Sequence, residues 1–191
     1  MFKKGFIATL FVLALSLEVC AQSVSSFAGI PFGATRETVI EEVMKLGYEP
    51  YGRTGEGERV VIPVYMLADL PVQVDFIFNK NDKFYAFEVR TGRVERARLS
   101  KSFEAVAYMS EQFTAKYGQS SQDATLKETD LREGIHNLYQ QWFSVKALDI
   151  YTAIVQKDGR YFAIGTVTHR TLAKEANQVR KPREKTTVPA F

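Results

Sequence analysis

An Asp-Gly turn between two apolar runs is the feature that most constrains the fold of this chain. Residues 148–155 lead into the turn at Asp158-Gly159, and residues 161–167 return from it. Asp-Gly is among the strongest signals for a two-residue β-hairpin, because both residues tolerate the positive φ angles that such a turn requires. The sequence therefore predicts antiparallel strands over 147–156 and 160–168.

A second hairpin is predicted over 72–90, where polar and apolar residues alternate on both sides of an Asn- and Asp-containing turn. The simplest pairing places Phe78 opposite Lys83 and Val74 opposite Phe87, so that one face is almost wholly apolar. The other face then carries a mixed set of side chains: Gln73, Asp75, Ile77, Phe84, Ala86, Glu88 and Arg90.

Two helices are predicted, over 36–46 and 100–117. In the first, Thr35 is a good N-cap, Glu37 lies in the first turn, and Gly47 follows the last turn, where a left-handed residue ends many helices. In the second, apolar residues recur at helical spacing and Gly118 follows them. Each helix therefore precedes a set of predicted strands.

The two halves of the chain resemble one unit written twice. The hairpin turns at Lys80 and Lys157 lie 77 residues apart, which is too long a period for a solenoid repeat. The predicted strands are 48–53, 59–66, 72–79 and 83–90, followed by 122–129, 135–144, 147–156 and 160–168. This pattern predicts an α+β fold with two tandem helix-plus-antiparallel-sheet modules (α-β-β-β-β twice) and the helices packed on one face. Whether the two sheets join is left open.

The N-terminus is interpreted as a signal peptide over residues 1–21. Lys3 and Lys4 precede about a dozen apolar residues, which are too few to span a bilayer as a helix. Cleavage after Ala21 would remove Cys20, the only cysteine. In the alternative, Cys20 is lipidated and anchors the protein to a membrane. An exported, periplasmic or extracellular protein is expected, with membrane contact only if Cys20 carries lipid.

The charge of the chain is concentrated at its ends. The total is +3, to which the signal peptide contributes +1 and the 170–191 segment +4, which leaves −2 for residues 22–169. The 170–191 segment is interpreted as a basic, mobile and solvated tail. The remaining chain divides into a first module over 22–95 and a second over 96–169.

The opening of the first module resembles a known family. Residues 27–39 read Phe-Ala-Gly-Ile-Pro-Phe-Gly-Ala-Thr-Arg-Glu-Thr-Val, similar to the entry into the first helix of secreted bacterial modules of the β-lactamase inhibitory protein type (BLIP-like modules). The resemblance covers about 27–168 and implies tandem modules whose sheet face, away from the helices, binds other proteins. The family's inhibitory activity is not carried over to this chain.

Catalytic chemistry has little support in the sequence. His136 and His169 are 33 residues apart, and the mature chain has no cysteine beside them, so the spacing of a zinc site is absent. Asp75 and Glu88 share a predicted strand face and are the candidate pair for a carboxylate-based hydrolase. Exposed strands commonly carry such pairs as solvated ion pairs, so we expect no enzyme and no cofactor.

Binding chemistry has more candidates. Arg90, Arg93, Arg96, Arg98 and Lys101 form a basic run, which suits an exposed linker helix or, alternatively, contact with an acidic partner. Aromatic residues on an open sheet face are typical anchors for partners. The predicted binding residues on that face are Gln73, Asp75, Phe84, Glu88, Arg90, Trp142 and Tyr161.

The sequence thus predicts a secreted or periplasmic, non-enzymatic binding module of a bacterial cell envelope. Its partner would be an envelope or extracellular protein or peptide, engaged through the open sheet face, and export makes nucleic acid an unsuitable target. Two alternatives stay open: a glycan- or lipid-associated envelope factor anchored through Cys20, and a carboxylate-based hydrolase.

Overall fold

The computed structural model describes residues 26–52, 59–123 and 125–177. The expected signal peptide, Cys20 and the last 14 residues of the expected tail lie outside these ranges. Within them, no helix combines the length and the apolar character that crossing a membrane would require.

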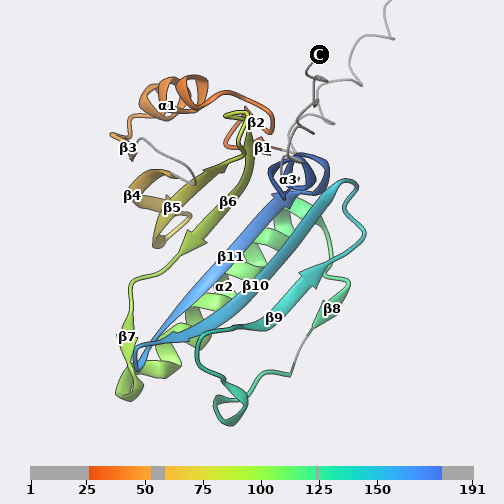
Figure 1. Ribbon diagram of the computed structural model, residues 1–191. Coiled ribbons are helices and arrows are strands. Elements are labelled where there is room, and N and C mark those ends of the chain that lie inside the picture. The colour runs from red at the N-terminus through yellow and green to blue at the C-terminus, as the bar shows by residue number, and fades with distance from the viewer. Residues whose placement is uncertain (1–25, 53–58, 124, 178–191) are drawn as a thin grey trace, which may run out of the picture.

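The described chain is a mixture of helices and antiparallel strands, as the α+β prediction requires (Figure 1). The helices are α1 (Arg36–Lys45), α2 (Leu99–Tyr117) and α3 (Arg170–Asn177), with short 3-10 helices η1 (Arg96–Arg98) and η2 (Glu128–Asp130). The strands are β1 (Ser26–Phe27), β2 (Ile30–Pro31), β3 (Tyr51–Gly52), β4 (Arg59–Leu67), β5 (Leu70–Phe78), β6 (Phe84–Arg90), β7 (Val94–Glu95), β8 (Gln122–Asp123), β9 (His136–Trp142), β10 (Leu148–Lys157) and β11 (Arg160–His169).

One large antiparallel sheet dominates the structure. Its strand order is β3-β4-β5-β6-β11-β10-β9-β8, and β7 also pairs with β11. The pairing of β6 with β11 joins the strands of the two halves of the chain, which answers the question that the sequence left open. Residues far apart in the sequence, such as Glu88 and Thr166, therefore lie directly opposite each other.

Helix α1 forms where its capping signals predicted. The Thr35 hydroxyl accepts a hydrogen bond from the backbone N–H of Thr38 (3.3 Å), which satisfies one of the free donors of the first turn. The helix ends at Lys45, and Gly47 follows with a φ of 86°, a conformation that glycine adopts at little cost. Val39 and Val43 are buried.

Helix α2 packs closely on the β9–β11 side of the sheet because of Gly165 on β11. A Cβ at this position would lie 2.7 Å from both the Met109 Sδ and the Phe113 Cζ atoms of the helix. Only glycine leaves room for this contact. Gly165 therefore marks the face of β11 that the helix covers.

Both long helices bury their apolar residues in one core. That core includes Val39 and Val43 of α1, Met109 and Phe113 of α2, and every second residue of β5. The shared β5 residues are Val72, Val74, Phe76 and Phe78. The N-terminal strands β1 and β2 also contribute aromatic rings to this side of the sheet, since Phe27 lies 5.0 Å from Phe76 between ring centroids.

The predicted register of the β5–β6 hairpin was wrong by two residues. Val74 lies opposite Val89 instead of Phe87, and a bulge after Ile77 places Phe78 opposite Phe84. The cause is the turn, in which the Asn79 side-chain oxygen accepts hydrogen bonds from the backbone N–H groups of Asn81 and Lys83 (3.0 Å each). This turn absorbs more residues than a simple hairpin and moves Phe84 to the core face.

Two predicted strands are shorter than expected. The 48–53 prediction corresponds to β3 alone, and the 122–129 prediction to β8, after which η2 forms. In η2 the Asp130 carboxylate accepts a hydrogen bond from the backbone N–H of Lys127 (3.2 Å). This local bond gives the backbone an alternative to pairing in the sheet.

The sequence predicted a mobile tail from residue 170 onward, but the structure has a helix at its start. Helix α3 begins there, and the Arg170 side chain donates hydrogen bonds to the Leu148 carbonyl (2.5 Å) and to Asp149 Oδ1 (2.7 Å). The Asn79 amide also donates to the Leu172 carbonyl (3.4 Å). These contacts attach α3 to the end of the sheet (Figure 1).

Candidate binding face of the sheet

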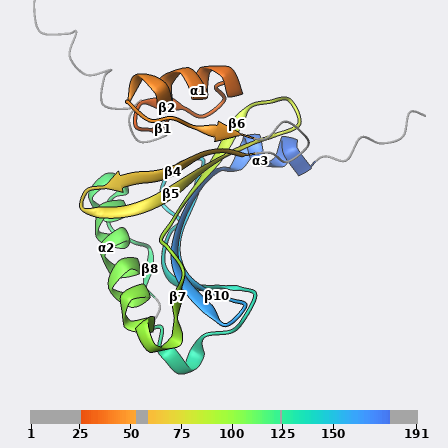
Figure 2. The same cartoon turned by 90° about the vertical axis from the view of Figure 1, so that its left-hand side faces the viewer.

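The face of the sheet away from α2, here called the open face, is concave. Figure 2 shows the strands bowed toward α2, with the hollow on the other side, and Figure 1 looks onto that hollow. Its side chains follow from the register of the central strands: Arg59, Gln73, Asp75, Ala86, Glu88, Arg90, His136, Leu138, Tyr151, Ala153, Val155, Phe162, Ile164 and Thr166.

The open face has a continuous row of polar residues across the sheet. Tyr151 lies opposite Thr166, Thr166 opposite Glu88, and Glu88 opposite Asp75. A second row runs beside it, in which Ile164 lies opposite Arg90. The β6–β11 pairing creates both rows, since it is the contact that brings the two halves of the chain together.

An ion network occupies the β4–β6 half of the open face. The Asp75 carboxylate, with a side chain only 3% exposed, accepts a hydrogen bond from the Arg59 guanidinium (2.8 Å) and one from the Gln73 amide (2.5 Å). Arg90 lies 3.6 Å from the same carboxylate, and Arg59 lies 3.6 Å from Glu88. Two cations thus balance two anions on this half.

Arg59 holds the network together. Partial burial lowers the pKa of the Arg59 guanidinium, but the hydrogen bond to Asp75 and the charges of Glu88 and Asp75 outweigh it. The net shift of the pKa is therefore upward, in favour of the charged form. Arg59 thus stays a cation at any pH at which the protein folds.

The β9–β11 half of the open face is apolar instead. Ala153, Val155, Phe162 and Ile164 form a buried cluster on β10 and β11, against which Tyr151 packs. These four residues, here called the apolar hollow, lie in the concave part of the sheet on the side away from α2. Leu138 of β9 lies opposite Ala153 and extends this surface with a partly exposed side chain.

Tyr151 of β10 is the member of the polar row that packs against the apolar hollow. The Tyr151 hydroxyl lies 2.8 Å from Nδ1 of His136 on the neighbouring strand β9, which is within hydrogen-bonding distance. Burial raises the pKa of Tyr151, the neighbouring Thr166 hydroxyl partly opposes this shift, and the Glu88 carboxylate adds a smaller upward contribution. The pKa of Tyr151 therefore depends mainly on its burial beside the apolar hollow.

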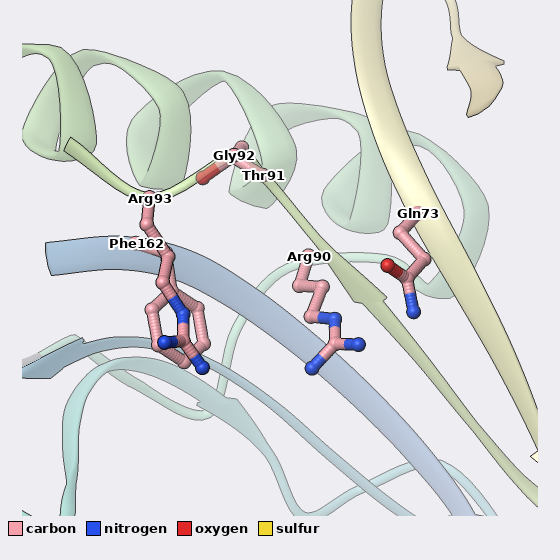
Figure 3. Close-up of a pocket in the computed structure, with 6 residues that line it drawn as sticks. All are labelled: Gln73, Arg90, Thr91, Gly92, Arg93 and Phe162. Carbon is pink, nitrogen blue, oxygen red and sulfur yellow. The ribbon is translucent and has the colours of Figure 1, made fainter. Parts of the chain in front are cut away.

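A small pocket lies where the two halves meet, at the end of β6 (Figure 3). Its volume is about 230 Å³, and the residues that line it are Gln73, Arg90, Thr91, Gly92, Arg93 and Phe162. The Arg93 guanidinium lies over the Phe162 ring, 5.8 Å from its centroid, a distance at which a cation is attracted to the ring. The pocket is therefore basic on its sides and aromatic on one wall.

Four of the seven predicted binding residues lie on the open face. Gln73, Asp75, Glu88 and Arg90 occupy neighbouring positions on β5 and β6, as the alternation predicted. Three of them contact one another, since the Asp75 carboxylate accepts a hydrogen bond from Gln73 and lies 3.6 Å from Arg90. Arg90 and Gln73 also line the pocket.

The other three predicted residues are on the covered face, and their placement on the open face was wrong. Phe84 is fully buried in the core because of the bulge before it. Trp142 is also fully buried, with its indole N–H donating to the Gly118 carbonyl (2.8 Å). Tyr161 is 3% exposed, on the same side of β11 as Gly165.

Several residues of the open face were not among the predicted binding residues, above all Phe162, Ile164 and Arg59. The Asp-Gly turn did place Val155 and Phe162 on a common face, but both faces of this hairpin are apolar. Gly165 was the one signal that could have distinguished them, because a glycine within a strand indicates close approach of another element.

The described residues contain no group of three or more His, Cys, Asp or Glu side chains that could hold a metal ion. The candidate carboxylate pair, Asp75 and Glu88, lies beside the pocket and is not among the residues that line it. Both oxygens of Asp75 accept hydrogen bonds, from Arg59 and Gln73. The arrangement thus has the features of an ion-pair network.

With this geometry in view, we compared the chain with known proteins. No protein-family model matches the chain, and neither the curated proteins nor the solved structures contain a match to it. The resemblance of residues 27–39 to the BLIP-like modules therefore stays a prediction.

Proposed function

We propose that this chain is an exported, non-enzymatic binding protein of a bacterial cell envelope, which holds a protein or peptide on its open face. The observation that carries the proposal is the concave open face, on which the exposed side chain of Leu138 lies over a buried apolar cluster and beside a charged half. Protein interfaces combine an apolar centre with a polar rim in this way. Because the sheet is already concave, a polypeptide segment could bind to this face without a rearrangement of the strands.

We also propose that the two halves, residues 22–95 and 96–169, are tandem copies of one α-β-β-β-β module. The order of elements supports this, because α1 precedes β3–β6 and α2 precedes β8–β11, apart from the short β7 and η elements. The last strand of each half, β6 or β11, pairs with the other. Joining two copies edge to edge would produce such a pairing.

Export rests on the sequence of residues 1–21, and the mass of the mature protein tests it. A chain that begins at Gln22 supports a free periplasmic or extracellular protein. A chain that begins at a lipidated Cys20 supports the alternative of an anchored glycan- or lipid-associated envelope factor. A chain that keeps residues 1–21 contradicts both.

The hydrolase alternative gains no support from the ion network. A general acid must hold a proton that it can give to the substrate, whereas Asp75 accepts hydrogen bonds from Arg59 and Gln73 and lies near Arg90. Both oxygens of Asp75 are thus engaged by neighbouring side chains of the sheet. We therefore assign the pair to the structure of the open face.

Site-specific photo-cross-linking in the native cells tests binding on the open face. A benzophenone amino acid replaces Leu138, which is 36% exposed on the open face, or Met44, which is 61% exposed on α1. We expect a discrete adduct with another polypeptide from position 138 and none from position 44. The absence of an adduct at position 138, or equal adducts at both positions, would contradict the proposal.

A further inference from the structure

We propose that the pocket between Arg90 and Arg93 is a subsite for one acidic side chain, Asp or Glu, of the polypeptide that binds the open face. This inference rests on the proposed function and names the chemistry that the partner must bring. The pocket lies at the edge of the apolar hollow, because Phe162 belongs to both.

The first support is the position of the two guanidinium groups. Figure 3 shows the Arg90 side chain between Gln73 and Arg93, with Arg93 alongside the ring of Phe162. Gln73 adds an amide that is itself held by Asp75 (2.5 Å). The pocket thus gathers two cations and a polar group around an aromatic wall.

The second support is that these guanidinium groups have unused donors. The nearest carboxylate oxygen lies 3.6 Å from Arg90, on Asp75, and 3.9 Å from Arg93, on Asp158. Both distances exceed those of hydrogen bonds. Within the described ranges, the contacts of these two guanidinium groups are the two long ion pairs and the approach of Arg93 to the Phe162 ring, without a hydrogen bond. Arginine has five N–H donors arranged to match a carboxylate, so the pocket offers donors that a bound carboxylate would accept.

The third support is the local charge. Arg59 and Arg90 balance Asp75 and Glu88, so Arg93 supplies the remaining positive charge. Its partner Asp158 has a side chain that is 73% exposed, and an ion pair this long and this exposed contributes little. One uncompensated positive charge suits the single negative charge of a carboxylate better than the double charge of a phosphate group.

The fourth support is size. The volume of about 230 Å³ is below the roughly 300–1,000 Å³ that pockets for drug-sized ligands have. Such a space can hold one amino-acid side chain and is small for a drug-sized ligand. Arg90, Ile164, Ala153 and Leu138 lie in one row across the open face. A segment that places its carboxylate in the pocket could therefore follow this row to the exposed side chain of Leu138.

Titration of the protein with blocked amino acids tests the subsite. The probe is N-acetyl-glutamate N′-methylamide, the neutral match is the corresponding glutamine derivative, and the readout is the NMR signals of the arginine Nε–Hε groups. We expect saturable shifts of the Arg90 and Arg93 signals with the glutamate probe and none with the glutamine probe.

Two substitutions distinguish binding at the subsite from a general effect of basic charge. Arg93→Gln should weaken binding about tenfold or more, as the loss of a hydrogen bond to a charged group implies. Arg98→Gln removes the same charge from η1, which does not line the pocket, and should change binding less than about twofold.

Four results would overturn the subsite: equal weakening by both substitutions, an equal response to the glutamine probe, tighter binding of inorganic phosphate, or no saturable shift with the glutamate probe up to about 0.1 M, a hundredfold above a millimolar Kd. The cross-linking experiment is read separately. An adduct at position 138 without glutamate binding removes the subsite and leaves the proposed function. Glutamate binding without an adduct contradicts the proposed function, and with it the polypeptide source of the carboxylate.

Discussion

The two halves of the open face share one backbone plan and differ in chemistry. Each half is centred on an antiparallel hairpin, β5–β6 or β10–β11, and the two hairpins lie side by side. On the open face, the β5–β6 hairpin carries Asp75, Glu88 and Arg90, whereas the β10–β11 hairpin carries Phe162 and Ile164. Burial of apolar surface contributes most to affinity, whereas charges contribute more to specificity and orientation. If the open face binds a polypeptide as proposed, the two halves would contribute to binding in these different ways.

The charged half includes one side chain that water reaches. The ion network includes Arg59 on β4, near the β3 edge of the sheet, where its side chain is 40% exposed to water. The apolar hollow lies on β10 and β11, which have strands on both sides. Charges cost less free energy near an edge that water reaches, and apolar side chains gain more where it is excluded.

The largest effect should come from the apolar half. Ile164→Ala removes a fully buried side chain, and we expect the free energy of unfolding to fall by about 2–4 kcal/mol, because lost burial and the cavity left behind both count. Urea denaturation measures this difference. Val64→Ala, which shortens an exposed side chain on β4, is the matched control and should stay within about 0.5 kcal/mol. If both substitutions cost the same, the hollow is not a packed part of the fold.

A smaller effect should come from the charged half. Asp75→Asn keeps the shape of the side chain and removes its charge, which leaves Arg59 and Arg90 to compete for water. We expect a loss of about 1–2 kcal/mol, below the roughly 3–5 kcal/mol of a fully buried pair, because Arg59 is partly exposed. Thermal or urea unfolding at low and high salt measures it.

A double-mutant cycle assigns this loss to a specific pair. Asp75→Asn combined with Arg59→Gln should be non-additive by about 1 kcal/mol, because the two residues are in direct contact. The cycle of Glu88→Gln with Arg59→Gln should show a smaller coupling, since those atoms are 3.6 Å apart. Additive effects at both pairs would mean that the network does not stabilise the fold.

Much of the fold could be predicted from local signals. The Asp-Gly turn placed β10 and β11 correctly, and Thr35 with Gly47 bracketed α1, because these signals act within a few residues. The mixed face of β5 also followed from alternation, and with it Gln73, Asp75, Glu88 and Arg90. These residues gave the charged half of the candidate site.

The apolar half could not be predicted in the same way, because its placement depends on contacts between distant segments. Trp142 and Tyr161 were expected on the open face, yet the packing of α2 against Gly165 decides which side of the second hairpin is covered. Phe84 was misplaced for a local reason, the hydrogen bonds of Asn79 that lengthen the turn. The pairing of β6 with β11, which joins the two halves of the open face, cannot be predicted from the sequence of either strand alone.

The smallest effect should appear at the border of the two halves, in the pH dependence of stability. Burial raises the pKa of Tyr151, and Glu88 adds to the shift. The unfolded chain ionises this phenol near pH 10, whereas the folded protein keeps it protonated to higher pH. The contribution of Tyr151 is therefore fully present below about pH 10 and is lost as the pH rises through its folded pKa. Tyr151→Phe should make the free energy of unfolding fall less steeply above pH 10, as urea titrations between about pH 9 and 11 would measure. Glu88→Gln should flatten the same region to a lesser degree, because its charge is the weaker of the two causes. An unchanged slope in Tyr151→Phe would show that burial does not raise the pKa of this phenol.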